Sequence, residues 1–69
     1  MDKDTQVSLH RSEVGRADKM LKSGRFEDLY RDFAGVPSST RSVYFMMDAG
    51  RRLDTQEIDD LAKQLGIHR

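Results

Sequence analysis

The stretch that decides the fold is Val43-Tyr44-Phe45-Met46-Met47, the longest unbroken apolar run of the chain. On a helix, five adjacent apolar residues point all the way round the axis. A buried strand is the competing interpretation, because valine, tyrosine and phenylalanine favour strands. No second strand-like run is evident for it to pair with. We therefore expect a helix over residues 39–51, capped by Ser38 or Ser39, and either central to the fold or with an apolar face left for a partner.

Two flanking segments have clearer helical spacing. Residues 26–34 carry an apolar stripe at i, i+3, i+4 and i+7, and Gly35 and Pro37 end it. Residues 55–65 carry a second stripe of this kind, which begins at Ile58. Asp54 is the expected N-cap, with Glu57 three residues later, and Gly66 is the expected C-terminal glycine.

A looser stripe upstream, Val14, Ala17, Met20 and Leu21, predicts a first helix over residues 8–22. We expect residues 1–7 to be frayed. The predicted fold is thus all-α, one small domain over residues 1–69 with four short helices at 8–22, 26–34, 39–51 and 55–65.

Composition narrows the function classes. The 69 residues suffice for one domain, and the 12 basic and 12 acidic residues cancel, which argues against a protein that coats a polyanion. A chain this short has a small core and usually needs an additional source of stability. This cannot be a disulfide, because cysteine is absent. We therefore expect self-association or a protein partner. No leader or membrane-length apolar run is evident, so the predicted location is the cytoplasm.

The residues that carry chemistry are sparse. His10 and His68 lie near opposite ends of the chain without metal-ligand spacing, and Asp59 and Asp60 are typical of a solvated helix face. The five glycines are isolated, so no phosphate-binding loop is present. We predict no enzymatic activity, no metal and no cofactor.

Basic residues gather between positions 11 and 25. On a helix several of them would share one ridge, which leaves direct DNA binding open as a third function. The possible nucleic-acid contacts are Arg16, Lys19, Lys22 and Arg25.

Two stretches carry a resemblance to a known family. Phe26-Glu27-Asp28-Leu29-Tyr30-Arg31-Asp32-Phe33 and Asp48-Ala49-Gly50-Arg51-Arg52-Leu53 resemble the second helix and the end of the third helix of the Hha/YmoA proteins. These are small, all-α, bacterial transcription modulators that bind the nucleoid protein H-NS. The resemblance covers about 40 residues. It implies a nucleoid-associated role, with Asp48 standing in for the family's acidic residue.

The preferred function is therefore a non-enzymatic protein–protein interaction module that modulates transcription, with an H-NS-like nucleoid protein or another transcription component as partner. The alternative is a phage- or plasmid-type small regulator, possibly homodimeric, that inhibits a host enzyme or transcription factor. Aromatic residues, methionine and arginine are enriched at interface cores. The expected contact residues are Arg41, Tyr44, Phe45, Met46, Asp48, Arg51 and Arg52, with Met47 beside them.

Overall fold

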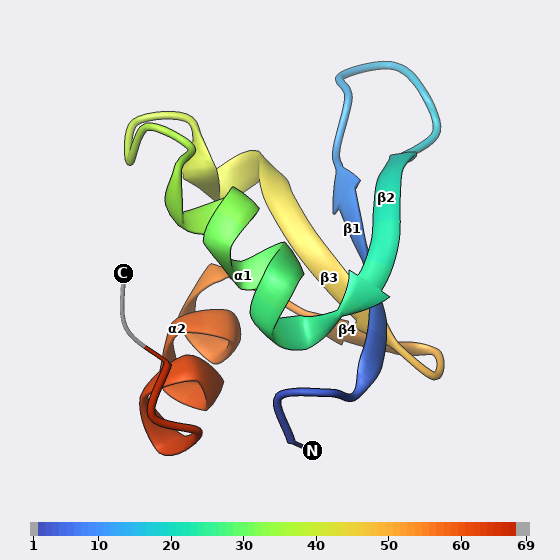
Figure 1. Cartoon of the computed structure of the whole chain (residues 1–69). Coiled ribbons are helices and arrows are strands. Elements are labelled where there is room, and N and C mark those ends of the chain that lie inside the picture. Colours follow the sequence, from blue (N-terminus) through green and yellow to red (C-terminus); the bar gives the residue numbers. More distant parts are fainter. Residues whose placement is uncertain (1, 68–69) are drawn as a thin grey trace.

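The computed structural model describes residues 2–67, which form a four-stranded antiparallel sheet and two α-helices (Figure 1). Along the sheet the strands lie in the order β2-β1-β3-β4. The elements in chain order are β1 (Gln6–Arg11), β2 (Lys19–Arg25), α1 (Phe26–Ala34), a short 3-10 turn (Arg41–Val43), β3 (Tyr44–Asp48), β4 (Arg51–Leu53) and α2 (Thr55–Gln64).

The all-α prediction is wrong, since the chain is an α+β protein. The helix expected over residues 8–22 is replaced by β1, a loop and β2. The helix expected over 39–51 is replaced by the 3-10 turn, β3 and the first residue of β4. Residues 6 and 7 of the segment expected to fray belong to β1, and the side chain of Val7 is buried in the core.

The partner strand that the sequence did not reveal is β1. Val7 and Leu9 are buried while Ser8 and His10, which alternate with them, are only half-buried. This is the two-residue period of a strand with one face in the core. Only two large apolar residues carry the pattern, and polar neighbours dilute it. In the sheet β1 lies between β2 and β3 and pairs with both.

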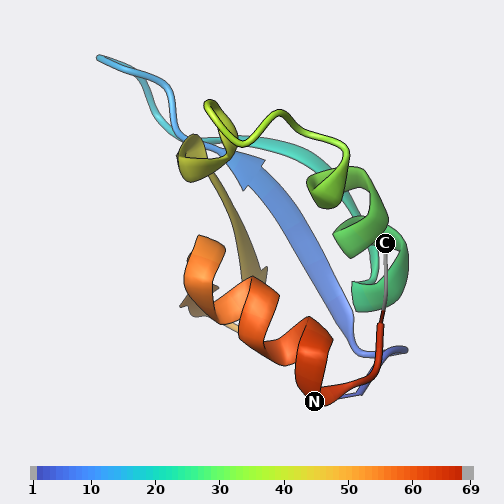
Figure 2. The same ribbon diagram turned by 90° about the vertical axis from the view of Figure 1, so that its left-hand side faces the viewer.

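β2 follows no apolar alternation, and six of its seven residues are exposed. It is an edge strand held by its register with β1, and a shift in that register leaves Leu21 without a partner opposite it. The hairpin between β1 and β2 extends past the body of the molecule (Figures 1 and 2). Val14 in this hairpin is fully exposed.

A two-residue turn joins β3 to β4. Ala49 has φ 50° and Gly50 has φ 89°, while Asp48 and Arg51 pair across the turn. Positive φ at both central residues is the geometry of the hairpin turn that matches strand twist. The stretch 48–51, expected as the end of a helix, is therefore a β-hairpin turn.

Both flanking helices were predicted correctly. α1 has the predicted bounds, and α2 ends at Gln64, one residue earlier than expected. The Asp54 side chain accepts a hydrogen bond from the Glu57 backbone N–H at 3.0 Å, so the predicted N-cap is confirmed. Gly66 has φ 73°, as expected of a glycine that follows a helix.

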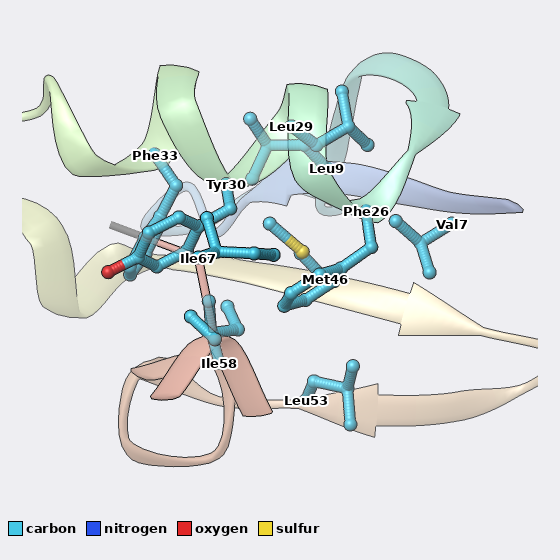
Figure 3. Close-up of a cluster of buried hydrophobic side chains, with 11 residues drawn as sticks. Val7, Leu9, Phe26, Leu29, Tyr30, Phe33, Met46, Leu53, Ile58 and Ile67 are labelled. Atoms are coloured by element: carbon cyan, nitrogen blue, oxygen red, sulfur yellow. The ribbon is translucent and has the colours of Figure 1, made fainter. Parts of the chain in front are cut away.

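The two helices lie on the same face of the sheet (Figure 2). α1 packs against β1 and β2, and α2 packs against β3 and β4. Between helices and sheet lies the core, which Figure 3 shows. Neither helix within residues 2–67 is long and apolar enough to cross a membrane. The core residues are Val7, Leu9, Phe26, Leu29, Tyr30, Phe33, Met46, Leu53, Ile58, Ala62 and Ile67.

Candidate functional site

The face of the sheet turned away from the helices is the candidate site, and we call it the open face. Neither α1 nor α2 covers it (Figure 2). Strand alternation and register identify its side chains, because residues paired across antiparallel strands share a face. Within residues 2–67 the open face consists of Ser8, His10, Met20, Ser23, Phe45, Met47 and Arg52, and the register adds the pair Gln6 and Arg25 at one end of it.

Phe45 is the centre of the open face. Its side chain is 4% exposed although no helix covers it, because its neighbours on the sheet do. The His10 ring stacks on the Phe45 ring with 5.1 Å between centroids and 9° between planes. The Arg52 guanidinium carbon lies 3.9 Å from the centroid of the same ring. An aromatic ring, an imidazole and a guanidinium thus form one stacked cluster.

The His10 ring is fixed from a second direction. Ser8 Oγ and His10 Nε2 lie 2.7 Å apart and share a hydrogen bond. A hydroxyl this close to an imidazole is one pair of a nucleophilic triad. No carboxylate among residues 2–67 makes a hydrogen bond to this imidazole. The pair therefore lacks the group that orients the base in a triad, and its evident effect is to hold the ring over Phe45.

Charge divides unequally between the two faces. The open face carries Arg52 and, at one end, Arg25, which is paired with Asp4 and Asp28. None of the side chains that belong to this face within residues 2–67 is a carboxylate. Of the 12 acidic residues, seven lie in α1 and α2 or at the Asp54 cap. The remaining five are Asp2, Asp4, Glu13, Asp18 and Asp48. Most of the carboxylates within residues 2–67 therefore lie on or next to the helices and not on the open face.

Of the seven predicted contact residues, Phe45 and Arg52 meet on the open face. Arg41 has another role, because its guanidinium donates hydrogen bonds to the backbone oxygens of Ala34 (3.2 Å) and Val36 (2.8 Å). It thereby satisfies a carbonyl at the end of α1. Arg51 points to the helix side and pairs with Glu57 of α2 at 3.0 Å.

The other three predicted contact residues lie away from the open face. Met46 is completely buried among the core residues, and Tyr44 packs against the same core. Asp48 ends β3 opposite Arg51. Adjacent residues of a strand point to opposite faces, so one strand divides the apolar run between the core and the open face.

The four possible nucleic-acid contacts do not form one ridge. Arg16 lies in the loop of the hairpin and Lys19 begins β2. Lys22 pairs with Asp32 of α1. Arg25 pairs with Asp28 of α1 and also reaches a second carboxylate, which belongs to Asp4, at 2.7 Å.

These ion pairs change the acidity of their members. The hydrogen bond from Arg25, together with its charge, holds the pKa of Asp28 below its usual value, while partial desolvation opposes the shift. Asp28 in turn raises the pKa of Arg25, with a smaller contribution from Asp4. Arg25 is therefore engaged by carboxylates of its own chain.

The sequence interpretation missed Ser8, His10, Met20 and Ser23. The signal that could have found Ser8 and His10 was their alternation with the apolar residues Val7 and Leu9, because residues two apart in a strand share a face. The residues that the structure describes hold no group of three or more histidine and acidic side chains able to bind a metal ion. His68 lies outside the described residues.

Three comparisons with known proteins complete the description: no family model, no curated protein and no solved structure matches the chain.

Proposed function

We propose that this chain is a non-enzymatic protein–protein interaction module that binds its partner with the open face. The observation that carries the proposal is the one-sided cover of the sheet, with both helices on one face and Phe45, Met47 and Arg52 on the other. Aromatic residues, methionine and arginine are the types enriched at interface cores. Methionine also adapts its shape to an irregular partner surface.

The size of the chain supports the proposal in a second way. A domain of 69 residues has a small core, and a bound partner adds stability by mass action. Here the stacked cluster of His10, Phe45 and Arg52 covers the ring on the free protein. The open face is therefore compatible with a folded monomer that later receives a partner.

We further propose that the partner belongs to the transcription machinery and that the chain modulates transcription in the cytoplasm. The support for this is the sequence resemblance, of which the segment 26–33 is helical as expected. The third helix of that family has no counterpart, because its place is taken by β3 and β4. An H-NS-like nucleoid protein is the first partner to try, by titrating the labelled chain with it.

The experiment that tests the proposal compares capture of partner proteins by matched variants. Met47→Glu places a carboxylate on the open face, and Gln64→Glu places the same group on the exposed end of α2. We expect proteins captured by the wild type to be lost with Met47→Glu and kept with Gln64→Glu. Equal capture by all three chains contradicts the proposal, as does a wild type that captures no more than Met47→Glu.

A homodimer is the alternative occupant, and it would fit the small-regulator interpretation. The exposed side chain of Met20 favours this possibility, because it adds apolar surface to the open face beside His10. Sedimentation equilibrium distinguishes a homodimer from a monomer that binds a different protein. A stable dimer that Met47→Glu dissociates would mean that the open face is occupied by a second copy.

A further inference from the structure

Arg52 differs from most other arginines of the chain in its partners. Arg11, Arg25, Arg31 and Arg51 each lie against a carboxylate, and Arg41 donates to backbone carbonyls. Arg52 is exposed, and no hydrogen bond or ion pair joins its side chain to another residue within the described range 2–67. Its neighbour in sequence, Arg51, forms an ion pair with Glu57.

The contact of Arg52 with the Phe45 ring leaves its hydrogen-bonding capacity intact. A guanidinium that stacks on a ring uses its flat face, whereas its five N–H donors lie in its own plane. At 3.9 Å from the Phe45 centroid, the stack is close. It limits the rotamers of a long side chain before any ligand arrives, and less conformational entropy is then lost on binding. Arg52 is thus an oriented cation with free donors.

The surroundings of Arg52 select the charge of a ligand. No carboxylate side chain within residues 2–67 belongs to the open face, so the guanidinium of Arg52 is the charge that a ligand meets beside Phe45. We propose that Arg52, held on Phe45, binds a side-chain carboxylate of the partner, so that the segment docking on the open face is acidic. This inference rests on the proposed function.

A protein carboxylate is favoured over a nucleic-acid phosphate by the number of available cations. Affinity for nucleic acid grows with the number of phosphates that the protein neutralises. Lys22 and Arg25 are engaged by Asp32 and Asp28, and the chain as a whole has no net positive charge. One oriented arginine among methionine and serine side chains fits a single carboxylate within a mixed apolar and acidic segment.

A second copy of this chain is a poor occupant of the same site. In a symmetric dimer each copy presents the same patch to the other. Two open faces would then bring Arg52 and His10 of each copy together, with no carboxylate from either face. Charge complementarity therefore favours a different, acidic protein.

The test selects short random peptides displayed on phage against the full chain and reads their composition and affinity. Arg52→Gln removes the cation from the open face, and Arg52→Lys keeps the charge but not the planar stack. Arg31→Gln makes the same chemical change on α1, away from the open face, where Arg31 has only a loose pair with Glu27 at 3.8 Å. Circular dichroism checks that each variant is folded before affinities are compared.

We expect the selected peptides to be rich in aspartate and glutamate. Arg52→Gln should lower the affinity for these peptides about tenfold to a hundredfold, the usual effect of a lost hydrogen bond to a charged group. Arg52→Lys should recover only part of the loss, and Arg31→Gln should bind as the wild type does. Replacing the acidic residues of a selected peptide by their amides should lower its affinity for the wild type. Its affinity for Arg52→Gln should stay the same.

Two results overturn the inference while leaving the proposed function in place: peptides without acidic enrichment, or peptides that Met47→Glu abolishes and Arg52→Gln does not affect. Peptides that bind regardless of Met47→Glu, or no selected peptides at all, contradict the proposed function as well. A single-stranded oligothymidylate is the comparison probe. If it binds the chain more tightly than the peptides, with affinity that falls steeply with salt and depends on Arg52, the ligand is a phosphate and the carboxylate assignment is wrong.

Discussion

The guanidinium of Arg52 lies over the ring of Phe45, 3.9 Å from its centroid, on the face of the sheet that neither helix covers. The contact joins the third strand of the chain to the fourth. It hides an aromatic ring that the fold leaves without a helix above it. It also orients the guanidinium of Arg52, which has no carboxylate partner within residues 2–67.

A double-mutant cycle should measure this contact. We expect Arg52→Ala and Phe45→Leu to be coupled by about 0.5–1 kcal/mol in the free energy of unfolding, the usual range for an exposed cation–π pair. Urea titration of the wild type, both single variants and the double variant supplies the four values. Strict additivity of the two substitutions would show that the stack contributes no stability.

The division of the apolar run predicts opposite outcomes for neighbouring methionines. Met46→Asp puts a carboxylate into the core and should unfold the chain, because an unpaired buried charge is far more costly than so small a domain tolerates. Met47→Asp places it on the open face and should leave the protein folded, with a loss of about 1 kcal/mol or less. Circular dichroism and thermal melting distinguish the two. Similar losses from both would contradict the strand.

The sequence predicted the two helices because each has a full apolar stripe and its own end signals. The helix over 26–34 has the expected bounds, and the cap at Asp54 is confirmed. Both features depend on neighbours within a few residues, which a single sequence displays directly.

The sheet could not be predicted in the same way, since its stability depends on pairing between distant segments. β2 carries no apolar alternation, and its place depends on β1. The segment of β1 carries only two large apolar residues, Val7 and Leu9, so the sequence shows no evident partner strand for the run from Val43 to Met47 and predicts a helix there. Of the open face, the sequence analysis names Phe45, Met47 and Arg52. Ser8 and His10 join them only because β1 pairs with β3, which the sequence alone does not show.

The turn between β3 and β4 predicts a stabilising substitution. Asparagine tolerates positive φ better than alanine, so Ala49→Asn should raise the free energy of unfolding by about 0.5 kcal/mol. Gly50→Ala should lower it by about 1 kcal/mol, because a side chain at φ 89° is strained even though the space around it is empty. Urea midpoints of the two variants against the wild type provide the measurement. A destabilising Ala49→Asn would contradict the turn geometry.

Arg41 should matter for folding more than for binding. Arg41→Ala removes the donors to two backbone carbonyls and the guanidinium 5.5 Å from the Phe33 centroid. We expect a loss of about 1–3 kcal/mol in the free energy of unfolding, the range for carbonyls left without a partner. The folded variant should keep the affinity of the wild type for a peptide bound to the open face. If Arg41→Ala lowered the affinity for the peptide and left the free energy of unfolding unchanged, Arg41 would belong to the interface instead.

The pair of Asp28 and Arg25 predicts a contribution to stability at low pH. Because Arg25 depresses the pKa of Asp28 in the folded protein below its ordinary value of 3.8, the pair stabilises the fold above that value. The contribution is lost as the pH falls through the folded pKa. Carboxyl-carbon NMR should place the Asp28 midpoint below 3.8. The free energy of unfolding of Asp28→Asn should decline less steeply in acid than that of the wild type. An Asp28 midpoint at or above the ordinary carboxyl value would contradict the pairing.

The most direct test of the open face as the interaction surface uses the methyl groups of Met20, Met46 and Met47. In one NMR spectrum of methyl-labelled protein, Met20 reports on the edge strand, Met46 on the core and Met47 on the open face. On addition of an acidic peptide selected against the chain, the signals of Met20 and Met47 should shift and saturate together, while Met46 stays in place. Saturable binding that leaves the Met47 methyl unchanged would contradict the account.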